Sequence, residues 1–212
     1  VERKALAQPY DPLVFASLEE VDLRHSNAYV YTLARWPSGI TWTLGASGDW
    51  FDGALTERNQ FNPKLGAVWD LTTGTTLRGA FFRTLKRSLV ADQTLEPTQV
   101  AGFNQFFDDP DGTDAWRYGL GVDQQVGERL LVGLEWSRRE LDDIAFLEVN
   151  TLTGAVEVAE ADWREEVWRA YVYWAPHPWW AFKAEWLYED FDRDEAFTGP
   201  ELIAALETHR FP

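Results

Sequence analysis

The sequence predicts an all-β protein built as an antiparallel up-and-down transmembrane β-barrel. Three observations lead to this prediction. Side chains alternate in character with a period of two, short and long connections alternate between the predicted strands, and aromatic residues gather at strand ends. A period of two is typical of a β-strand whose faces meet different environments. We expect one barrel domain over residues 1–212, because all-β barrels reach this length without dividing.

The alternation is clearest between residues 180 and 189. Large apolar groups occupy one face of this predicted strand, and the other face carries Lys183, Glu185 and Glu189. The pattern returns in segment after segment, and the chain contains 12 Trp residues. So many large rings exceed what the half-buried sheet of a soluble protein presents. A wall with lipid on one side and a polar interior on the other explains both faces.

Turn residues divide the pattern into four hairpins. Their strands cover residues 28–36 and 40–46, 65–71 and 77–81, 116–122 and 130–136, and 168–174 and 180–188. We expect a further strand at 13–23. After Pro200, we expect either another strand or a short helix over 201–212.

The predicted connections differ in length. Those near residues 38, 73, 127 and 177 are short, whereas the others are long and cover 53–60, 87–114, 139–162 and 190–200. Strict alternation of this kind is typical of a membrane barrel with tight turns on one side and extended loops on the other. A Greek-key sandwich would mix the two lengths.

Aromatic residues form two groups along these strands. The group close to the short turns consists of Trp36, Trp42, Trp69, Trp174, Trp179 and Trp180. The group towards the long loops consists of Trp50, Phe51, Trp116, Trp136, Trp163, Trp186 and Tyr188. Two interfacial girdles of a membrane barrel would give this distribution. The alternative is that the rings fill the core of a soluble protein.

The composition argues against several other classes. A formal net charge of -16 disfavours nucleic acid as a partner, because its phosphates would be repelled. The sequence has no run of about 18 apolar residues, so it predicts no transmembrane helix. It has no Cys for thiol or disulfide chemistry, and we expect no cofactor. Because the chain opens on Val1 rather than Met, we expect a processed or excised segment.

Two stretches carry a family resemblance. Residues 62–66 (NPKLG), together with residues 75–78 (TTLR), resemble the hairpins of TonB-dependent-receptor-type barrels. Residues 82–119 resemble a set of bacterial outer-membrane barrels, some linked to tetratricopeptide repeats and some described as TonB-receptor-like. The resemblance is strongest over residues 61–190. It implies a location in a Gram-negative outer membrane and a role in transport of solute or polymer, as a pore, receptor or export channel wall.

Receptor barrels of this type have more strands than the nine or ten predicted here. We therefore expect a partial arc of a larger barrel, incomplete at one or both ends. Further strands or a periplasmic domain would then come from unseen sequence or another chain. No plug domain and no TonB box is recognised, so energised uptake is not predicted. The expected partners of the outer surface are lipid and lipopolysaccharide.

The polar face of the predicted strands supplies the candidate functional residues. It carries both signs of charge, which indicates a salt-bridged or water-filled wall rather than a filter of one sign. Cross-strand ion pairs that hold the barrel together are the first interpretation. The predicted lumen-facing charged residues are Arg35, Lys64, Asp70, Arg78, Arg117, Asp123, Arg129, Glu135, Arg169, Lys183, Glu185 and Glu189.

Acidic residues are concentrated in the long predicted loops. Such loops could attract cations or share divalent ions with lipopolysaccharide, but simple solvation of exposed loops is the favoured interpretation. Asp108, Asp109, Asp111 and Asp114 surround Gly112 and offer the hard oxygen ligands that calcium prefers. Their spacing differs from that of an EF-hand, and a turn at residues 110–112 is the alternative interpretation.

Two other functional classes stay open. A barrel hydrolase would need His25, His177 or His209 beside a partner at the rim. The sequence has no G-x-S-x-G, P-loop, dinucleotide or H-E-x-x-H motif, so it predicts no enzyme. The main alternative is a secreted soluble β-sandwich that binds glycans through exposed Trp. Such a sandwich would purify from an aqueous lysate, whereas a barrel arc would need detergent.

Overall fold

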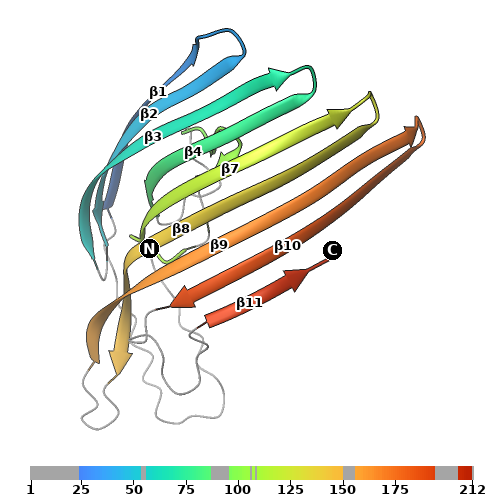
Figure 1. The fold of residues 1–212 in the computed structure, drawn as a ribbon. Coiled ribbons are helices and arrows are strands. Elements are labelled where there is room, and N and C mark those ends of the chain that lie inside the picture. Colours follow the sequence, from blue (N-terminus) through green and yellow to red (C-terminus); the bar gives the residue numbers. More distant parts are fainter. Residues whose placement is uncertain are drawn as a thin grey trace.

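The computed structural model describes residues 24–53, 56–86, 96–105, 107, 109–149, 156–193 and 205–211. They form one nine-stranded sheet and a separate two-stranded hairpin, β5–β6 (Figure 1). The large sheet comprises β1 (Arg24–Arg35), β2 (Ile40–Asp52), β3 (Glu57–Thr72), β4 (Thr75–Leu85), β7 (Asp114–Val126), β8 (Leu130–Val149), β9 (Val156–His177), β10 (Trp180–Arg193) and β11 (Ala205–Arg210). The hairpin comprises β5 (Gln99–Val100) and β6 (Phe103–Asn104).

Every neighbouring pair of strands in the large sheet is antiparallel, and the spatial order follows the chain order from β1 to β11. This confirms the prediction of an all-β, antiparallel, up-and-down fold. No helix in the described residues is long and apolar enough to cross a membrane. The predicted strand at 13–23 lies outside the described residues, and the last predicted element is a strand rather than a helix.

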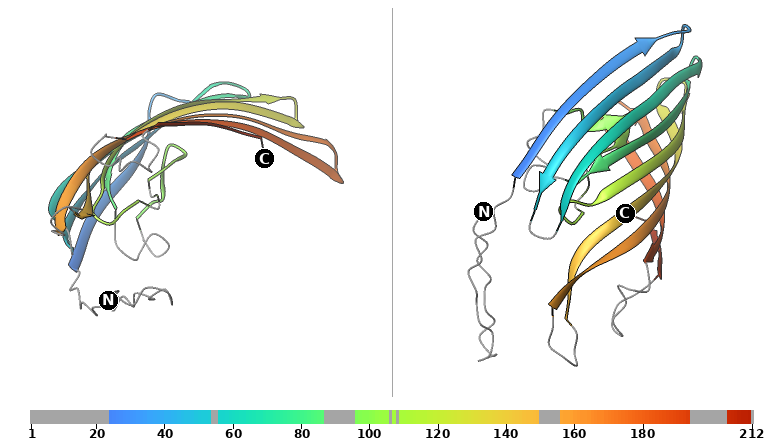
Figure 2. Two further views of the ribbon diagram at one scale, coloured as in Figure 1. Left: turned by 90° about the horizontal axis from the view of Figure 1, so that it is seen from below. Right: turned by 90° about the vertical axis from the view of Figure 1, so that its left-hand side faces the viewer.

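The large sheet is curved and open (Figure 2). Strands β1 and β11 lie at its two edges and do not pair with each other in the described part of the chain. Hairpin β5–β6 lies on the concave side of the sheet, which we call the inner face; the convex side is the outer face. An open, curved, single-layer sheet is consistent with an arc of a larger barrel.

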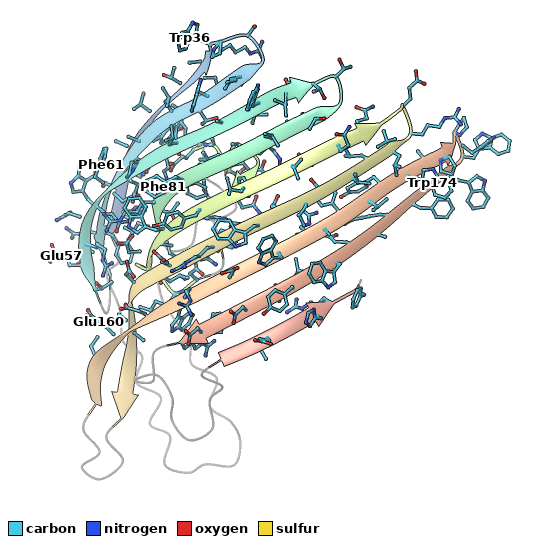
Figure 3. All side chains as sticks on the ribbon, viewed as in Figure 1. Trp36, Glu57, Phe61, Phe81, Glu160 and Trp174 are labelled. Atoms are coloured by element: carbon cyan, nitrogen blue, oxygen red, sulfur yellow. The ribbon has the colours of Figure 1, made fainter. Side chains whose placement is uncertain are left out.

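The register fixes which side chains share a face. Residues Asp123, Gly133, Tyr171 and Glu185 are successive partners across β7 to β10 and lie on the inner face. The next residue along each strand points to the opposite face. Leu120, Trp136, Trp168 and Tyr188 are likewise successive partners and lie on the outer face. Figure 3 shows the outer face with Phe61, Phe81 and Trp174 labelled.

The short turns occur where the sequence predicts them. Two of the predicted long loops, at 53–60 and 139–162, are instead partly strand. Gly39, Gly74 and Gly127 adopt positive φ in the β1–β2, β3–β4 and β7–β8 turns, a conformation that glycine reaches without steric cost. Half of the predicted loop at 53–60 is instead strand, because β3 begins at Glu57 and pairs with β2 from there. Beyond this pairing, the Gly53 N–H donates to Thr56 O at 3.0 Å.

The predicted loop at 139–162 is also mostly strand. Strands β8 and β9 remain paired from Leu130–Trp174 out to Val149–Val156, with one irregularity between Leu141 and Ile144. This hairpin is long enough to extend beyond the rest of the sheet (Figure 1). The strict alternation of short and long connections is therefore wrong at 53–60 and overstated at 139–162.

Two aromatic residues assigned to the girdle lie on the inner face instead. Phe51 is almost fully buried there, beside the ring of His25. Trp163 pairs with Leu141 in the register and packs against the buried cluster that contains Ile144. In each case the next residue along the strand points to the outer face, because successive side chains of a strand alternate between the two faces.

Glycines on the inner face allow tyrosine rings to lie flat against the backbone of a neighbouring strand. A Cβ atom at Gly133 would overlap the Tyr171 ring, and one at Gly45 would lie 2.6 Å from Cδ1 of Tyr31. By contrast, a Cβ at Gly79 on the outer face would lie 3.6 Å from Leu120, an ordinary contact.

We predict that Gly133→Ala lowers the free energy of unfolding by about 1–3 kcal/mol, because the added methyl displaces the Tyr171 ring from a packed position. Gly79→Ala is the matched control and should have little effect, since the site has room. Urea unfolding of the refolded protein measures both variants. Equal stability of the two variants would contradict the close packing of Tyr171 on Gly133.

Candidate functional site

The candidate site is the inner face together with the hairpin that lies on it. The register places all the charged residues predicted to face a lumen on this one face, with the exception of Arg129. Arg129 instead belongs to the β7–β8 turn, where its Nη1 donates to the carbonyl oxygen of Pro176 at 2.8 Å. Apart from Arg129, the alternation in the sequence therefore assigned these charged residues to the same face as the structure does.

The centre of the inner face holds an ion-paired network around Arg78. Its Nε donates to Asp123 Oδ2 at 2.8 Å, and its Nη2 donates to Glu135 Oε2 at 3.1 Å. The Tyr171 hydroxyl donates to the other oxygen of Asp123. The side chains of Arg78, Asp123 and Glu135 are mostly buried. The cost of removing each charge from water is offset by its attraction to the opposite charge beside it.

A second group continues the network towards β10. Arg169 donates to Glu185 and lies over the Tyr171 ring, with its Cζ 4.9 Å from the ring centroid. Lys183 pairs with the other oxygen of Glu185 at 2.6 Å and is half exposed. Groups of both signs are thus paired with one another across β4, β7, β8, β9 and β10. This part of the face is a salt-bridged wall and not a field of one sign.

The hairpin at residues 96–105 was not expected from the sequence. It covers the inner face of β3, β4 and β7, and Val100 and Phe103 are buried with Phe82 in one apolar cluster. Glycines on the neighbouring strands leave the space that these side chains fill, and we call these spaces their seats. A Cβ at Gly66 would lie 2.7 Å from Val100 Cγ1, and one at Gly119 would lie 2.5 Å from Phe103 Cδ1.

A local signal for the hairpin does exist. Ala101 and Gly102 both adopt positive φ, 48° and 90°, and link two paired residues on each side. A two-residue turn ending in Gly is a common hairpin connection. The strands it joins are too short to show alternation, so the strand pattern alone does not reveal them.

Cationic side chains of the wall contact the aromatic rings of the hairpin and of Phe107, which lies two residues beyond it. The guanidinium of Arg139 lies 3.8 Å from the Phe107 ring centroid, and that of Arg117 lies 4.7 Å from it. Arg78 lies 5.3 Å from the centroid of Phe103. Arrangements of this kind are attractive because the face of an aromatic ring is electron-rich.

Polar contacts fix the other side of the hairpin to β1. The Tyr31 hydroxyl donates to Glu96 Oε1 at 2.6 Å, and Gln105 Nε2 donates to the same hydroxyl at 3.1 Å. Gln105 also donates to the carbonyl oxygen of Pro97 at 2.6 Å. Glu96 and Gln105 are buried, so these hydrogen bonds are shielded from water. The hairpin is therefore anchored at both its wall side and its β1 side.

The end of the inner face away from the short turns holds a separate polar cluster. Asp49 accepts hydrogen bonds from His25, Asn27 and Asn62, and Asn62 in turn accepts one from Gln60. Asn62 and Asp49 are almost fully buried. Buried polar side chains of this kind require partners, and here neighbouring strands provide them.

Two aspartates of the calcium hypothesis, Asp109 and Asp114, face cationic or amide partners. Asp109 accepts a hydrogen bond from Arg139 at 2.5 Å, and Asp114 accepts one from Arg83 Nε at 2.8 Å and one from Gln60 at 2.9 Å. Asp108 lies outside the described residues. Within the described part, no three acidic or histidine side chains are arranged to hold a metal ion. A calcium site here stays a prediction.

The three histidines occupy unrelated positions. His25 lies 2.8 Å from Asp49, His177 belongs to the end of β9 beside Trp179, and His209 on β11 packs against Tyr188. Among the described residues no hydrogen bond joins any of these imidazoles to a Ser or Thr hydroxyl. The geometry therefore gives no support to a barrel hydrolase.

Comparison with known proteins gives a likeness of fold. Neither a protein-family model nor a curated protein matches the sequence. A chain in the structure of the FpvAI–pyocin S2 complex superposes with a TM-score of 0.57 at 13% sequence identity. The match covers 88% of this chain and 26% of that chain. The protein described here thus spans about a quarter of the length of this structural neighbour.

We predict that Arg78→Gln destabilises the fold by about 1–3 kcal/mol, because Asp123 and Glu135 would repel each other without the guanidinium between them. Arg164→Gln is the control. Arg164 pairs with Asp192, but both side chains are 49% exposed, so a loss of only about 0–1 kcal/mol is expected. Urea unfolding again provides the measurement, and raised salt should reduce the Arg164 effect more than the Arg78 effect.

Proposed function

We propose that this chain forms part of the wall of an outer-membrane β-barrel and that the complete barrel moves solute or polymer across that membrane. The observation that carries the proposal is the division of one curved sheet into an exposed apolar face and a polar, ion-paired face. In water the apolar face would be a large unfavourable surface, whereas lipid accommodates it.

The outer face presents large apolar side chains along its whole width. The exposed ones include Val30, Leu44, Phe61, Leu65, Trp69, Phe81, Leu120, Leu134, Val172, Trp174 and Phe182. No second sheet covers them in the described part of the chain. A glycan-binding sandwich would bury one face of each sheet against another sheet. The observed arrangement favours the membrane proposal over the sandwich alternative.

Aromatic placement supports an interface at the short-turn end. Trp36, Trp179 and Trp180 are strongly exposed beside the β1–β2 and β9–β10 turns. Trp36 and Trp174 lie at this end in Figure 3, whereas Glu57 and Glu160 lie at the opposite end. Amphipathic indole rings favour the boundary between headgroups and hydrocarbon. The short turns would then face the periplasm, and the longer hairpins would face the outside.

The structural neighbour is consistent with this location. FpvA is a TonB-dependent receptor, and the neighbouring structure holds it in complex with a pyocin. For the protein described here we propose, by analogy of fold, a transport role and contact with membrane lipid and lipopolysaccharide. We further propose that it has no enzymatic activity.

We predict that arginine on the outer face is costly in a depth-dependent way. Leu120→Arg should destabilise the membrane-inserted protein by about 2–4 kcal/mol, because residue 120 lies mid-strand and its side chain is 61% exposed. Val126→Arg is the control, since residue 126 ends the strand at a short turn and should cost about 0–1 kcal/mol. Equilibrium unfolding in lipid vesicles measures the difference. Two equally small effects would contradict a lipid-facing outer surface.

Transport itself is tested with the complete protein in a planar bilayer. A passage through the barrel gives discrete conductance steps, and a closed barrel gives none. Requirement for detergent during purification and heat-modifiable gel mobility establish that the sample is a folded barrel. Absence of conductance from such a sample would overturn the transport proposal while leaving the membrane location intact.

A further inference from the structure

We propose that hairpin β5–β6 is a fixed constriction inside the barrel, one that presents uncharged hydrogen-bonding groups to the passage and so admits small uncharged hydrophilic solutes. The inference rests on the proposed transport function and specifies what the passage selects. It has three parts: the hairpin lies in the interior, it does not move freely, and its exposed surface is neutral.

The hairpin occupies interior space. It lies on the concave side of the sheet in both views of Figure 2. It extends over the wall from Gly119 on β7 to Gly66 on β3 and reaches Tyr31 on β1. A segment in that position reduces the open cross-section of any barrel that this arc helps to enclose.

Several independent contacts hold the hairpin in place. Val100 and Phe103 fill the seats above Gly66 and Gly119, Phe107 packs against two guanidinium groups, and Gln105 is hydrogen-bonded to Tyr31. Regions that open easily have few buried apolar contacts and exposed hydrogen bonds. The hairpin has the opposite character, so we assign it the role of a fixed element rather than a mobile gate.

The surface that the hairpin turns away from the wall is uncharged. The exposed residues of segment 96–105 are Pro97, Thr98, Gln99, Gly102 and Asn104, and the single charged residue of this segment, Glu96, is buried. Gln99 Nε2 donates to Asn104 Oδ1 at 3.0 Å, which aligns the two amides side by side. Amide and hydroxyl groups exchange hydrogen bonds with hydroxyl-rich solutes and give little preference for either sign of ion.

The wall beneath the hairpin contributes little net charge at this level. The cations and carboxylates of this part of the wall are equal in number: Arg78, Arg117, Arg139 and Lys64 balance Asp123, Glu135, Asp109 and Glu165. A charge placed on the hairpin surface would therefore dominate the local field. This property makes the proposal testable by a single isosteric substitution.

The test is the reversal potential of the complete protein in a planar bilayer under a KCl gradient. Asn104→Asp keeps an acceptor for the Gln99 amide and adds one negative charge, so the reversal potential should shift towards cation preference relative to the unmodified protein. Asn59→Asp is the matched control, because residue 59 is exposed on the outer face, and it should produce no shift.

The bore is tested in the same preparation by swelling of proteoliposomes in uncharged sugars of increasing size. Phe103→Ala removes the ring that holds the hairpin against Gly119, so it should raise the size of the largest sugar admitted. Gly119→Val adds bulk beneath Phe103 and displaces the hairpin towards the passage, so it should lower that size; Phe103→Ala covers the case in which Gly119→Val fails to fold. Gly79→Val, on the outer face, should leave the limit unchanged.

The outcomes separate the two proposals. A shift with Asn104→Asp and a larger size limit with Phe103→Ala support the constriction. Conductance that neither variant alters places the hairpin outside the passage and overturns this inference, while transport stands. Absence of conductance and swelling from every protein, including the unmodified one, overturns transport and the constriction together.

Discussion

The backbone hydrogen bonds between neighbouring strands are the constraint on which the rest of the structure depends. In the proposed membrane location, hydrocarbon would offer no partner to a peptide N–H or C=O, so each strand would have to satisfy these groups through its neighbours. The nine-stranded antiparallel ladder does so across its whole interior. Once the backbone is satisfied within one layer, the two faces are free to differ, and apolar side chains need no second sheet to cover them.

Burial in this protein consequently has an unusual location. One buried apolar cluster lies between the inner face and hairpin β5–β6 and contains Phe82, Val100 and Phe103, and a second one contains Ala115, Leu141 and Ile144. Other buried groups are polar, such as Asn62 and Asp49, and are satisfied by cross-strand partners. Packing density on the inner face depends on glycines, because Gly66 and Gly119 leave the space that the hairpin fills.

The sequence predicted the class of fold and the faces of the strands, since both depend on a local period of two. It placed Lys64, Arg78 and Asp123 on the same face as the structure does. The alternation did not predict the face correctly where two aromatic residues are adjacent, as at Trp50 and Phe51, because either side chain suits the outer face. The hairpin was missed because its position depends on distant partners. Nothing local in the sequence indicates that Gln105 meets Tyr31.

Arg117 shows why the hairpin and the wall have to be considered together. It is buried and faces Arg139 across the ladder, yet among the described residues no carboxylate lies within ion-pair distance of it. Its Nη2 donates to Ser137 at 3.1 Å, and the Phe107 ring covers its guanidinium. A buried cation without a carboxylate is costly unless other groups stabilise it. The hairpin segment supplies such a group, so removing it would expose an unfavourable charge arrangement. The wall therefore depends on the hairpin as much as the hairpin depends on its seats, which is the behaviour of a permanent part of the interior.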